Sequence, residues 1–418
     1  MRLQRLGAGG LPAEVLRALH ARARNRSLPT PAALIGQWFE AAAVIAPHLQ
    51  ARPVAPRDAF PSRYANRPTT TTTGGEPVIG GGWIGYRAYP DGAGRLPDAA
   101  GGWTDSVLRL DTSGCWWYES LTDIPCPAYL AAAALDPQCE PEPWSMRWTP
   151  PDRQSHHNNV EACKAAIRAG EVYQSCICTQ FTGQLTGRPA DFFTDAIEQT
   201  RPARAAYLQG HWGAVASLSP ELFLARNGTT VTSSPIKGTL PLSADPAALR
   251  GSAKDVAENV MIVDLVRNDL GRLAVTGTVT VTDLLRVRPA PGVWHLVSTV
   301  QAQIPPTTTT VELFEASFPP ASVTGCPKTR AQQLISDWET QPRGVYCGTV
   351  GMSSPLAGLE LNVAIRTVEF TATGSAVLGV GGGITIDSDP ASEWQECLDK
   401  ARTILDLTPA SPAHSSLC

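Results

Sequence analysis

The stretch from Ser217 to Gly271 concentrates the side chains that are best suited to covalent chemistry. Its most reactive group is the amine of Lys237, in the segment Pro-Ile-Lys-Gly-Thr. Proline restricts the backbone and glycine frees it, so this segment predicts a loop that presents the amine at one place. Glu221 lies sixteen residues upstream and could supply a proton. An uncharged lysine amine is a nucleophile and a protonated one is an ordinary surface cation, and the local sequence leaves both interpretations open.

Two pairs of carboxylates, each with a spacing of three residues, could bind a metal ion. Asp255 and Glu258 share one face of a predicted helix, and Glu393 and Glu396 share a face of another. Magnesium prefers oxygen ligands, so these four carboxylates would suit it if they converged. Each pair is also tolerable on a solvated helix, where like charges one turn apart cost roughly a few tenths of a kcal/mol. The spacing leaves both interpretations open.

Three further features place polar groups among apolar residues. His295 lies in an alternating strand pattern, where it could handle protons near neutral pH or be a satisfied core residue. Arg366 stands in the apolar segment Asn-Val-Ala-Ile-Arg-Thr, so its charge needs a carboxylate from the protein or from a ligand. The triple glycine at 381–383 predicts either a turn or a set of backbone N–H groups that bind an anion.

These residues must be positioned by the helices and strands that the hydrophobic pattern predicts. Helices are expected at Val160–Ala169 and Lys254–Leu270, and another is expected to begin near Pro327. Asp389 suits the N-cap of a last helix, with Pro390 in its first position. The predicted strands are Val78–Tyr86, Trp116–Tyr118, Glu171–Phe181, Trp212–Leu218, Val275–Val281, Trp294–Val300, Asn362–Phe370 and Ala376–Gly381.

The composition indicates a globular protein with a small-molecule partner. Its 418 residues, 43% of them hydrophobic, allow two ordinary domains or one large α/β unit. The net charge of −4 argues against nucleic acid and anionic membranes as partners, and the longest apolar runs are far shorter than the ~20 residues that span a bilayer. The ten cysteines are scattered, and we expect reduced thiols in small core volumes. No signal peptide is visible, so we expect a cytoplasmic protein.

The order of the predicted elements favours an α+β sandwich. Strands and helices alternate too irregularly for a doubly wound sheet, and no phosphate-binding loop follows a first strand. The Pro- and Ala-rich region 1–150 is assigned no chemistry.

Between Gln154 and Leu407 the chain carries many short motifs in a definite order. They are Tyr173-Gln174, Ser219-Pro-Glu221, Pro-Ile-Lys-Gly-Thr239, Glu258-Asn-x-Met-Ile-Val-Asp-Leu, His295-Leu-Val-Ser, Ser322-Val-Thr-Gly-Cys-Pro-Lys328, Ala364-Ile-Arg366-Thr, and Gly-Gly-Gly383 followed by Asp-Ser-Asp-Pro. With these motifs the chain resembles the chorismate-utilising enzymes, a family that includes the anthranilate, aminodeoxychorismate, isochorismate and salicylate synthases. So many motifs in the same order make chance agreement negligible.

The resemblance also implies an architecture. The family fold is a large α/β sandwich of two related subdomains, with mostly antiparallel sheets packed face to face and helices outside. We therefore expect a chorismate-binding catalytic core at 151–410, an N-terminal region at 1–150 that packs on this core, and a C-terminal tail at 411–418.

Two positions distinguish the branches of this family. Isochorismate and salicylate synthases carry a water-activating lysine where this chain has Gln174, so Gln174 resembles the amine-transferring branch. Anthranilate synthases typically have the motif Pro-Ile-Ala-Gly-Thr. This chain has Lys237 in place of the alanine, and the motif Pro-Ile-Lys-Gly-Thr resembles that of the aminodeoxychorismate synthases. The resemblance thus implies component I of such a synthase, which converts chorismate to 4-amino-4-deoxychorismate for 4-aminobenzoate and folate supply. The alternative is component I of an anthranilate synthase.

The same resemblance implies a role for each site residue. Lys237 would attack C2 of the chorismate ring and expel the C4 hydroxyl, Glu221 would protonate that hydroxyl, and ammonia would then attack C4 and release the lysine. His295 falls on the family's ring-facing histidine. The implied ligands of Mg²⁺, which would orient the ring carboxylate, are Glu258, Glu393 and Glu396 with Asp255 in support. The implied substrate-binding residues are Gln174, Thr239, Thr324, Gly325, Tyr346, Arg366, Gly381, Gly382 and Lys400.

The source of ammonia is expected to lie outside the chain. No nucleophilic cysteine in a glutamine-amidotransferase setting is apparent, so a separate amidotransferase subunit or free ammonium must supply the ammonia.

Two rival interpretations of the sequence come from other functional classes of protein. A non-catalytic chorismate-binding subunit would lack an acid or a metal ligand, and a Schiff-base enzyme would be trapped at Lys237 by borohydride with a carbonyl substrate.

Overall fold

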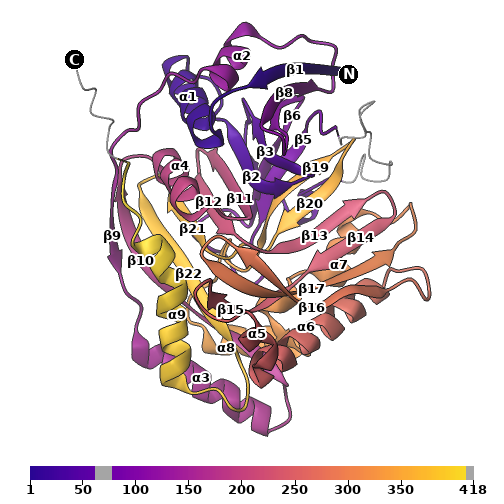
Figure 1. The fold of residues 1–418 in the computed structure, drawn as a ribbon. Coiled ribbons are helices and arrows are strands. Elements are labelled where there is room, and N and C mark those ends of the chain that lie inside the picture. The colour runs from indigo at the N-terminus through magenta and orange to yellow at the C-terminus, as the bar shows by residue number, and fades with distance from the viewer. Residues whose placement is uncertain (62–77, 411–418) are drawn as a thin grey trace.

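The computed structural model describes residues 1–61 and 78–410. Within these ranges the strands form one sheet of twelve strands and one of ten, with antiparallel neighbours. The sheets pack face to face and helices lie outside them (Figure 1). The predicted sandwich is confirmed. The predicted tail at 411–418 lies outside the described residues.

The twelve-stranded sheet contains β1 (Arg2–Ala8), β8 (Cys115–Ser120), β7 (Ser106–Leu110), β3 (Ala41–Ala46), β2 (Ala32–Trp38), β11 (Arg204–Gly210), β12 (Gly213–Ser219), β21 (Thr367–Thr371), β22 (Ser375–Ile384), β10 (Gln174–Thr186) and β18 (Gly325–Cys326), with β9 (Ser145–Thr149) paired to β10. The ten-stranded sheet contains β15 (Ile236–Pro241), β17 (Val293–Gln303), β14 (Thr230–Ser234), β13 (Leu222–Asn227), β20 (Gly358–Asn362), β19 (Thr349–Ser354), β5 (Gly82–Arg87), β6 (Ala99–Thr104) and β4 (Arg52–Pro53), with β16 (Thr280–Ala290) paired to β17. The α-helices are α1 (Pro12–Asn25), α2 (Ala128–Leu135), α3 (Arg153–Arg168), α4 (Pro189–Thr200), α5 (Ala247–Gly251), α6 (Ala253–Gly271), α7 (Thr310–Ser317), α8 (Lys328–Trp338) and α9 (Pro390–Leu405).

The alternation of side chains along β2 shows how the sheets are held together. Ala33 and Ile35 join the core under the outer helices, while Leu34 faces the opposite way. Leu34 packs in a cluster that also contains Ile84 of β5 and Met352 of β19, both from the other sheet. Because successive strand residues point to opposite faces, one apolar strand serves both cores.

Two chain segments cross from one sheet to the other side by side. The first links β12 to β13 through Pro220 and Glu221, and the second links β20 to β21 through residues 363–366. The N–H of Val363 donates to the carbonyl of Glu221 at 3.0 Å, and the N–H of Leu218 donates to the carbonyl of Arg366 at 2.9 Å. These hydrogen bonds join the two crossings, so residues from both sheets are brought to one place.

The second crossing corrects the predicted strand Asn362–Phe370. That segment is two strands in different sheets, and Arg366 lies between them with a φ of 50° rather than in the middle of a strand.

The predicted strand Val275–Val281 is also wrong, because β16 begins only at Thr280. Gly277 has a φ of 82° in the preceding turn, which no regular strand accommodates.

Helix boundaries near the predicted site follow the sequence signals closely. The side chain of Asp389 accepts a hydrogen bond from the N–H of Ser392, and Pro390 opens α9, as predicted. The predicted helix Lys254–Leu270 is confirmed as α6, which Ser252 caps by accepting from the N–H of Asp255. None of the helices in the described ranges combines the length and apolarity that a membrane-spanning helix needs.

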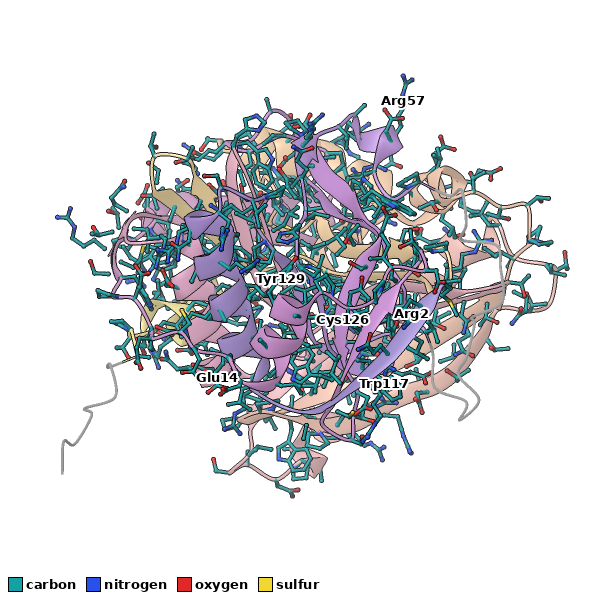
Figure 2. The ribbon with its side chains drawn as sticks, turned by 90° about the horizontal axis from the view of Figure 1, so that it is seen from above. Arg2, Glu14, Arg57, Trp117, Cys126 and Tyr129 are labelled. Carbon is teal, nitrogen blue, oxygen red and sulfur yellow. The ribbon has the colours of Figure 1, made fainter. Side chains whose placement is uncertain are left out.

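The region 1–150 contributes strands to both sheets. β2 pairs with β11, and β5 pairs with β19. Figure 2 shows part of this region from above, with Glu14 on α1, Tyr129 on α2, and Arg2 and Trp117 on the neighbouring strands β1 and β8. Strands from before and after residue 150 belong to the same two sheets, and the domain boundary near residue 150 remains a prediction.

A buried ion pair in this region gives a stability prediction. Arg109 Nε donates to Glu119 Oε1 at 2.5 Å, both side chains are almost fully buried, and Glu119 also accepts from the N–H groups of Ile79 and Gly80. Arg109→Leu would leave a buried carboxylate without its counterion, so we expect a loss of about 3–5 kcal/mol in the free energy of unfolding. Urea denaturation measures this loss. Arg267→Leu, in the exposed Arg267–Asp264 pair, is the control and should cost less than ~1 kcal/mol; equal losses would contradict the prediction.

Candidate active site

A cavity of about 860 Å³ opens beside the two crossings, where β15, β17, β22, α6 and α9 converge in the lower half of Figure 1. Most of the predicted site residues line it, although they come from segments far apart in the chain. The predicted residues in its wall are Glu221, Lys237, Thr239, Asp255, Glu258, His295, Tyr346, Arg366, Gly381, Gly382, Glu396 and Lys400.

Lys237 is presented by a strand rather than by the predicted loop. It lies on β15, whose pairing with β17 shifts between Lys237 and Thr239, and Gly238 at this bulge has a φ of 76°. A Cβ atom on Gly238 would lie 3.1 Å from side-chain atoms of Asp255, so glycine lets α6 approach closely. Lys237 Nζ donates a hydrogen bond to the carbonyl of Ser322 at 2.9 Å. The bulge therefore holds the amine in the cavity wall, where Ser322 also lies.

Glu221 sits at the first crossing with only 3% of its surface exposed. This burial raises the pKa of its carboxyl to about 7, against the opposing effects of a hydrogen bond with Ser322 and the charge of Lys237. A carboxyl with such a pKa carries a proton over part of the neutral pH range. Glu221 is thus suited to be a general acid close to the Lys237 amine.

Arg366 has no ion-pair partner among the carboxylates of the described residues. Burial lowers the pKa of its guanidinium, and it lines the cavity from the second crossing. The sequence left open whether its partner is a carboxylate of the protein or of a ligand, and this geometry favours a ligand.

His295 faces the cavity from β17, opposite Thr239 in the strand register. Its Nδ1 lies 2.9 Å from the Thr239 hydroxyl, while its buried Nε2 has no hydrogen-bond partner. Burial, aided by the charge of Arg366, lowers the pKa of His295 to about 4. The ring is therefore neutral near pH 7 and can hydrogen bond to a ligand without carrying charge.

The glutamates of α6 and α9 converge on the triple glycine. This segment is part of β22 and pairs with β10, so it is not a turn, and the binding of a carboxylate by its backbone N–H groups stays a prediction. A Cβ atom on Gly382 would lie 3.2 Å from Glu393 Oε2 and 3.6 Å from Glu396 Oε1, and one on Gly383 would lie 3.2 Å from Glu258 Oε2. The absence of side chains lets three carboxylates close over one strand.

Two lysines neutralise this cluster. Lys400 lies 2.7 Å from Glu396 and donates to the carbonyl of Gly381 at 2.8 Å. Lys254, which sequence reasoning did not select, donates to Glu393 Oε1 at 2.9 Å and lies 3.9 Å from Glu258 Oε1. Its position four residues before Glu258 on a helix was the available signal.

The cluster fits a hard divalent cation in its chemistry. Carboxylate oxygens are the ligands that magnesium prefers, and Glu393 Oε2 is buried without a hydrogen-bond partner. As arranged here, however, no three carboxylate, thiol or imidazole groups of the described residues are set to hold a metal. The magnesium set Glu258, Glu393, Glu396 and Asp255 stays a prediction.

Three predicted substrate-binding residues lie behind the cavity wall, together with Glu393. Gln174 begins β10, is fully buried, and neither its amide nitrogen nor its amide oxygen has a hydrogen-bond partner. A Cβ atom on Gly383 would lie 2.1 Å from Gln174 Nε2, so this amide lies directly against the glycine strand. Gly325 pairs with Ser175, and the Thr324 hydroxyl donates to the carbonyl of Pro320. The substrate-binding roles of these residues stay predictions.

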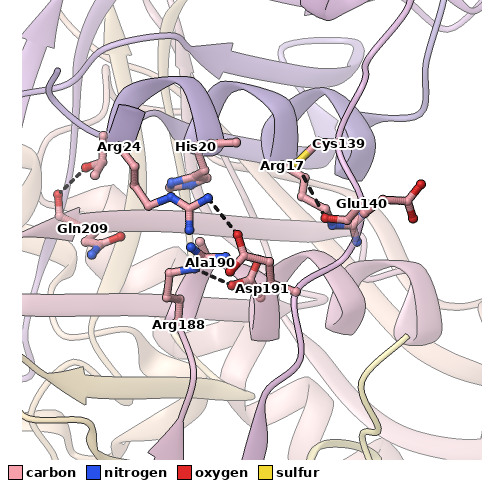
Figure 3. A pocket seen from close by; sticks show the side chains of 12 residues that line it. Arg17, His20, Arg24, Cys139, Glu140, Arg188, Ala190, Asp191 and Gln209 are labelled. Carbon is pink, nitrogen blue, oxygen red and sulfur yellow. Dashed lines mark hydrogen bonds and ion pairs between the residues drawn. The ribbon is translucent and has the colours of Figure 1, made fainter. Parts of the chain in front are cut away.

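A second, smaller cavity lies between α1 and α4 (Figure 3). Its volume is about 70 Å³, and its charged groups bind one another. Arg24 and Arg188 both bind Glu142, and Arg188 also binds Asp191 at 2.7 Å. Because these arginines are paired with carboxylates of the protein, the cavity is best explained by packing between the helices.

Comparison with known proteins decides the family. The model of the chorismate binding enzyme family matches residues 73–406. The chain belongs to this family. Membership agrees with the motifs of the sequence and with the gathering of most of the predicted site residues in one cavity.

Relatives within the family carry several functions. The chain is 38% identical over 269 residues to aminodeoxychorismate synthase component 1 of Escherichia coli, a match that covers 63% of this chain and 58% of the relative. It is 36% identical to aminodeoxychorismate synthase of Streptomyces griseus, over 78% of this chain and 50% of that protein, and 33% identical to anthranilate synthase component 1 of Streptomyces coelicolor, over 69% and 58%. The chain thus spans little more than half the length of these curated relatives.

The solved structures of this family share the fold. Anthranilate synthase component I from Streptococcus pneumoniae superposes with a TM-score of 0.69 at 24% identity, covering 90% of each chain. An isochorismate synthase from Bacillus anthracis, described as putative and specific for 2,3-dihydroxybenzoate, superposes with a TM-score of 0.65 at 20% identity, covering 90% of this chain and 94% of that one. At these identities the likeness concerns architecture alone.

Proposed function

We propose that this chain is component I of an aminodeoxychorismate synthase, which replaces the C4 hydroxyl of chorismate by an amino group. The observation that carries the proposal is the placement of the Lys237 amine in the cavity wall beside the protonatable, buried Glu221. Covalent capture by a lysine divides one difficult substitution into two easier ones.

The proposed reaction has two steps that balance. In the first, the uncharged Lys237 amine forms a bond to ring C2, the two ring double bonds shift, and the C4 hydroxyl leaves as water with the proton of Glu221. In the second, ammonia forms a bond to C4, the double bonds shift back, and the C2–nitrogen bond breaks to release the Lys237 amine. The new C4 ammonium group then returns one proton to Glu221. The sum is chorismate plus ammonia giving 4-amino-4-deoxychorismate and water.

The remaining residues of the wall bind and orient the substrate. Arg366, whose charge has no carboxylate partner in the described residues, would bind the enolpyruvyl carboxylate together with Tyr346. The neutral ring of His295 would contact the substrate ring. Glu258, Glu393 and Glu396 would hold Mg²⁺, with Asp255 in support, and the bound ion would neutralise and orient the ring carboxylate.

The ammonia is proposed to come from a separate glutamine amidotransferase subunit or from ammonium salt. Burial raises the pKa of Cys176 to about 11 and that of Cys163 to about 12, which suits inert thiols rather than nucleophiles. The Escherichia coli relative is named component 1, a name that is consistent with a second protein component in that enzyme.

The direct test is product identification. Purified protein is incubated with chorismate, Mg²⁺ and ammonium ions, and the products are identified by mass. We expect 4-amino-4-deoxychorismate with its enolpyruvyl ether intact, and no reaction when EDTA replaces Mg²⁺. Formation of anthranilate and pyruvate would instead assign the chain to anthranilate synthase, and full activity in EDTA would remove the metal from the proposal.

A further inference from the structure

Lys254 contacts two of the carboxylates of the acidic cluster. Its ammonium lies 2.9 Å from Glu393 Oε1 and 3.9 Å from Glu258 Oε1, so it bridges α6 and α9. The side chains of Glu393 and Glu258 are only 3% and 9% exposed, whereas that of Lys254 is 45% exposed. Glu258 and Lys254 line the cavity and Glu393 lies behind its wall, so the half-exposed lysine connects the cavity with a buried carboxylate.

The other contacts of the cluster make Lys254 its exchangeable member. Glu396 has its own cation in Lys400, which is also tied to the carbonyl of Gly381. Glu393 Oε1 accepts from the Ser388 hydroxyl at 2.6 Å as well as from Lys254, and its Oε2 is buried without a partner. Apart from Lys254, no cation of the described residues lies within ion-pair distance of Glu393 or Glu258.

We propose that Lys254 is a built-in counterion that holds the place of the divalent cation, so that cation binding and the Lys254–Glu393 contact exclude each other. The inference rests on the magnesium set of the proposed function. A divalent cation bound by Glu393 and Glu258 would repel an ammonium ion on the same oxygens, and the half-exposed lysine can leave for water. Without the metal, Lys254 relieves the repulsion between the two buried carboxylates.

The contact then lowers the apparent affinity for the metal. When only a fraction of the protein has the site free, the apparent Kd rises by the inverse of that fraction. If Lys254 occupies the site in roughly nine molecules of ten, removing it lowers the Kd about tenfold. Lys400→Met is the matched control. It also removes one lysine charge from the cluster, but at Glu396, which has no ion pair with Lys254.

The first experiment measures metal binding without turnover. Mn²⁺ is titrated into the substrate-free full chain and followed by its electron paramagnetic resonance signal, for wild type, Lys254→Met and Lys400→Met. We expect the Kd of Lys254→Met to fall about tenfold, and that of Lys400→Met to change less than threefold. Equal gains in both variants, or no gain in Lys254→Met, would overturn the inference. Circular dichroism of each variant confirms that it is folded.

The second experiment observes the lysine itself. The wild-type protein is treated briefly with an amine-acetylating reagent with and without saturating Mg²⁺, and acetylation of each lysine is quantified by peptide mass spectrometry. We expect acetylation of Lys254 to rise at least threefold with Mg²⁺, while Lys328, held by Asp269 away from the cavity, does not change. Metal binding without a rise at Lys254 would overturn this inference alone. Absence of metal binding in wild type and Lys254→Met would overturn the magnesium set of the proposed function as well.

Discussion

Replacement of Lys237 by alanine is expected to lower the glutamine-coupled or ammonium-dependent rate of chorismate amination on the order of 10³-fold or more. In the proposed mechanism Lys237 forms the bond to C2, whereas Lys400 in the same wall is held by Glu396 and by the carbonyl of Gly381. Residual turnover would have to proceed by direct attack of ammonia, and its product is expected to shift toward anthranilate. Initial rates and product masses measure both effects.

Lys237→Arg is the control for this experiment. Arginine keeps the positive charge near Glu221 but remains protonated, so it cannot be a nucleophile. We therefore expect Lys237→Arg to be as inactive as Lys237→Ala, whereas a purely electrostatic role of Lys237 would leave it largely active. Wild-type rate and product in Lys237→Ala would remove this residue from the mechanism.

Glu221→Gln is expected to lower the same rate roughly 10²- to 10⁴-fold, the range that a positioned general acid contributes. Glutamine preserves the shape of the side chain at the crossing but has no acidic proton for the departing hydroxyl. Steady-state rates at saturating chorismate measure the loss.

The pH dependence of the wild type provides the control. Because burial raises the pKa of Glu221 to about 7, its proton is present below that pH and is lost above it. The rate of the acid-assisted step should therefore fall about tenfold per pH unit above pH 7, and Glu221→Gln should lack this descending limb. If the rate of Glu221→Gln falls above pH 7 in the same way as that of the wild type, another group is responsible for the titration.

The local sequence was sufficient for the helices that flank the site. Ser252 caps α6 and Asp389 caps α9, and both are short-range signals that need no tertiary information. The predicted site residues were also identified correctly as neighbours, since most of them line one cavity. Their roles in binding and catalysis stay predictions.

Features that depend on long-range contacts could not be read from the sequence. The strand pattern around Arg366 is continuous, yet the chain leaves one sheet and enters the other there. Only the pairing of β20 with β13 and of β21 with β12 reveals this change of sheet. The triple glycine looks like a turn but is held in β22 by its pairing with β10, and its lack of side chains leaves space for the glutamates. The contact of Lys254 with Glu393 joins residues 139 positions apart.

The pairing of early with late strands constrains the order in which the molecule can be assembled on the ribosome. Trp83 of β5 pairs with Ser353 of β19, which is translated about 270 residues later. At roughly 5–20 residues per second, that edge of β5 waits on the order of 15–50 s for its neighbour. An unpaired edge is a template for association with other chains, so the yield of native protein should depend on chaperones that shield the nascent N-terminal half.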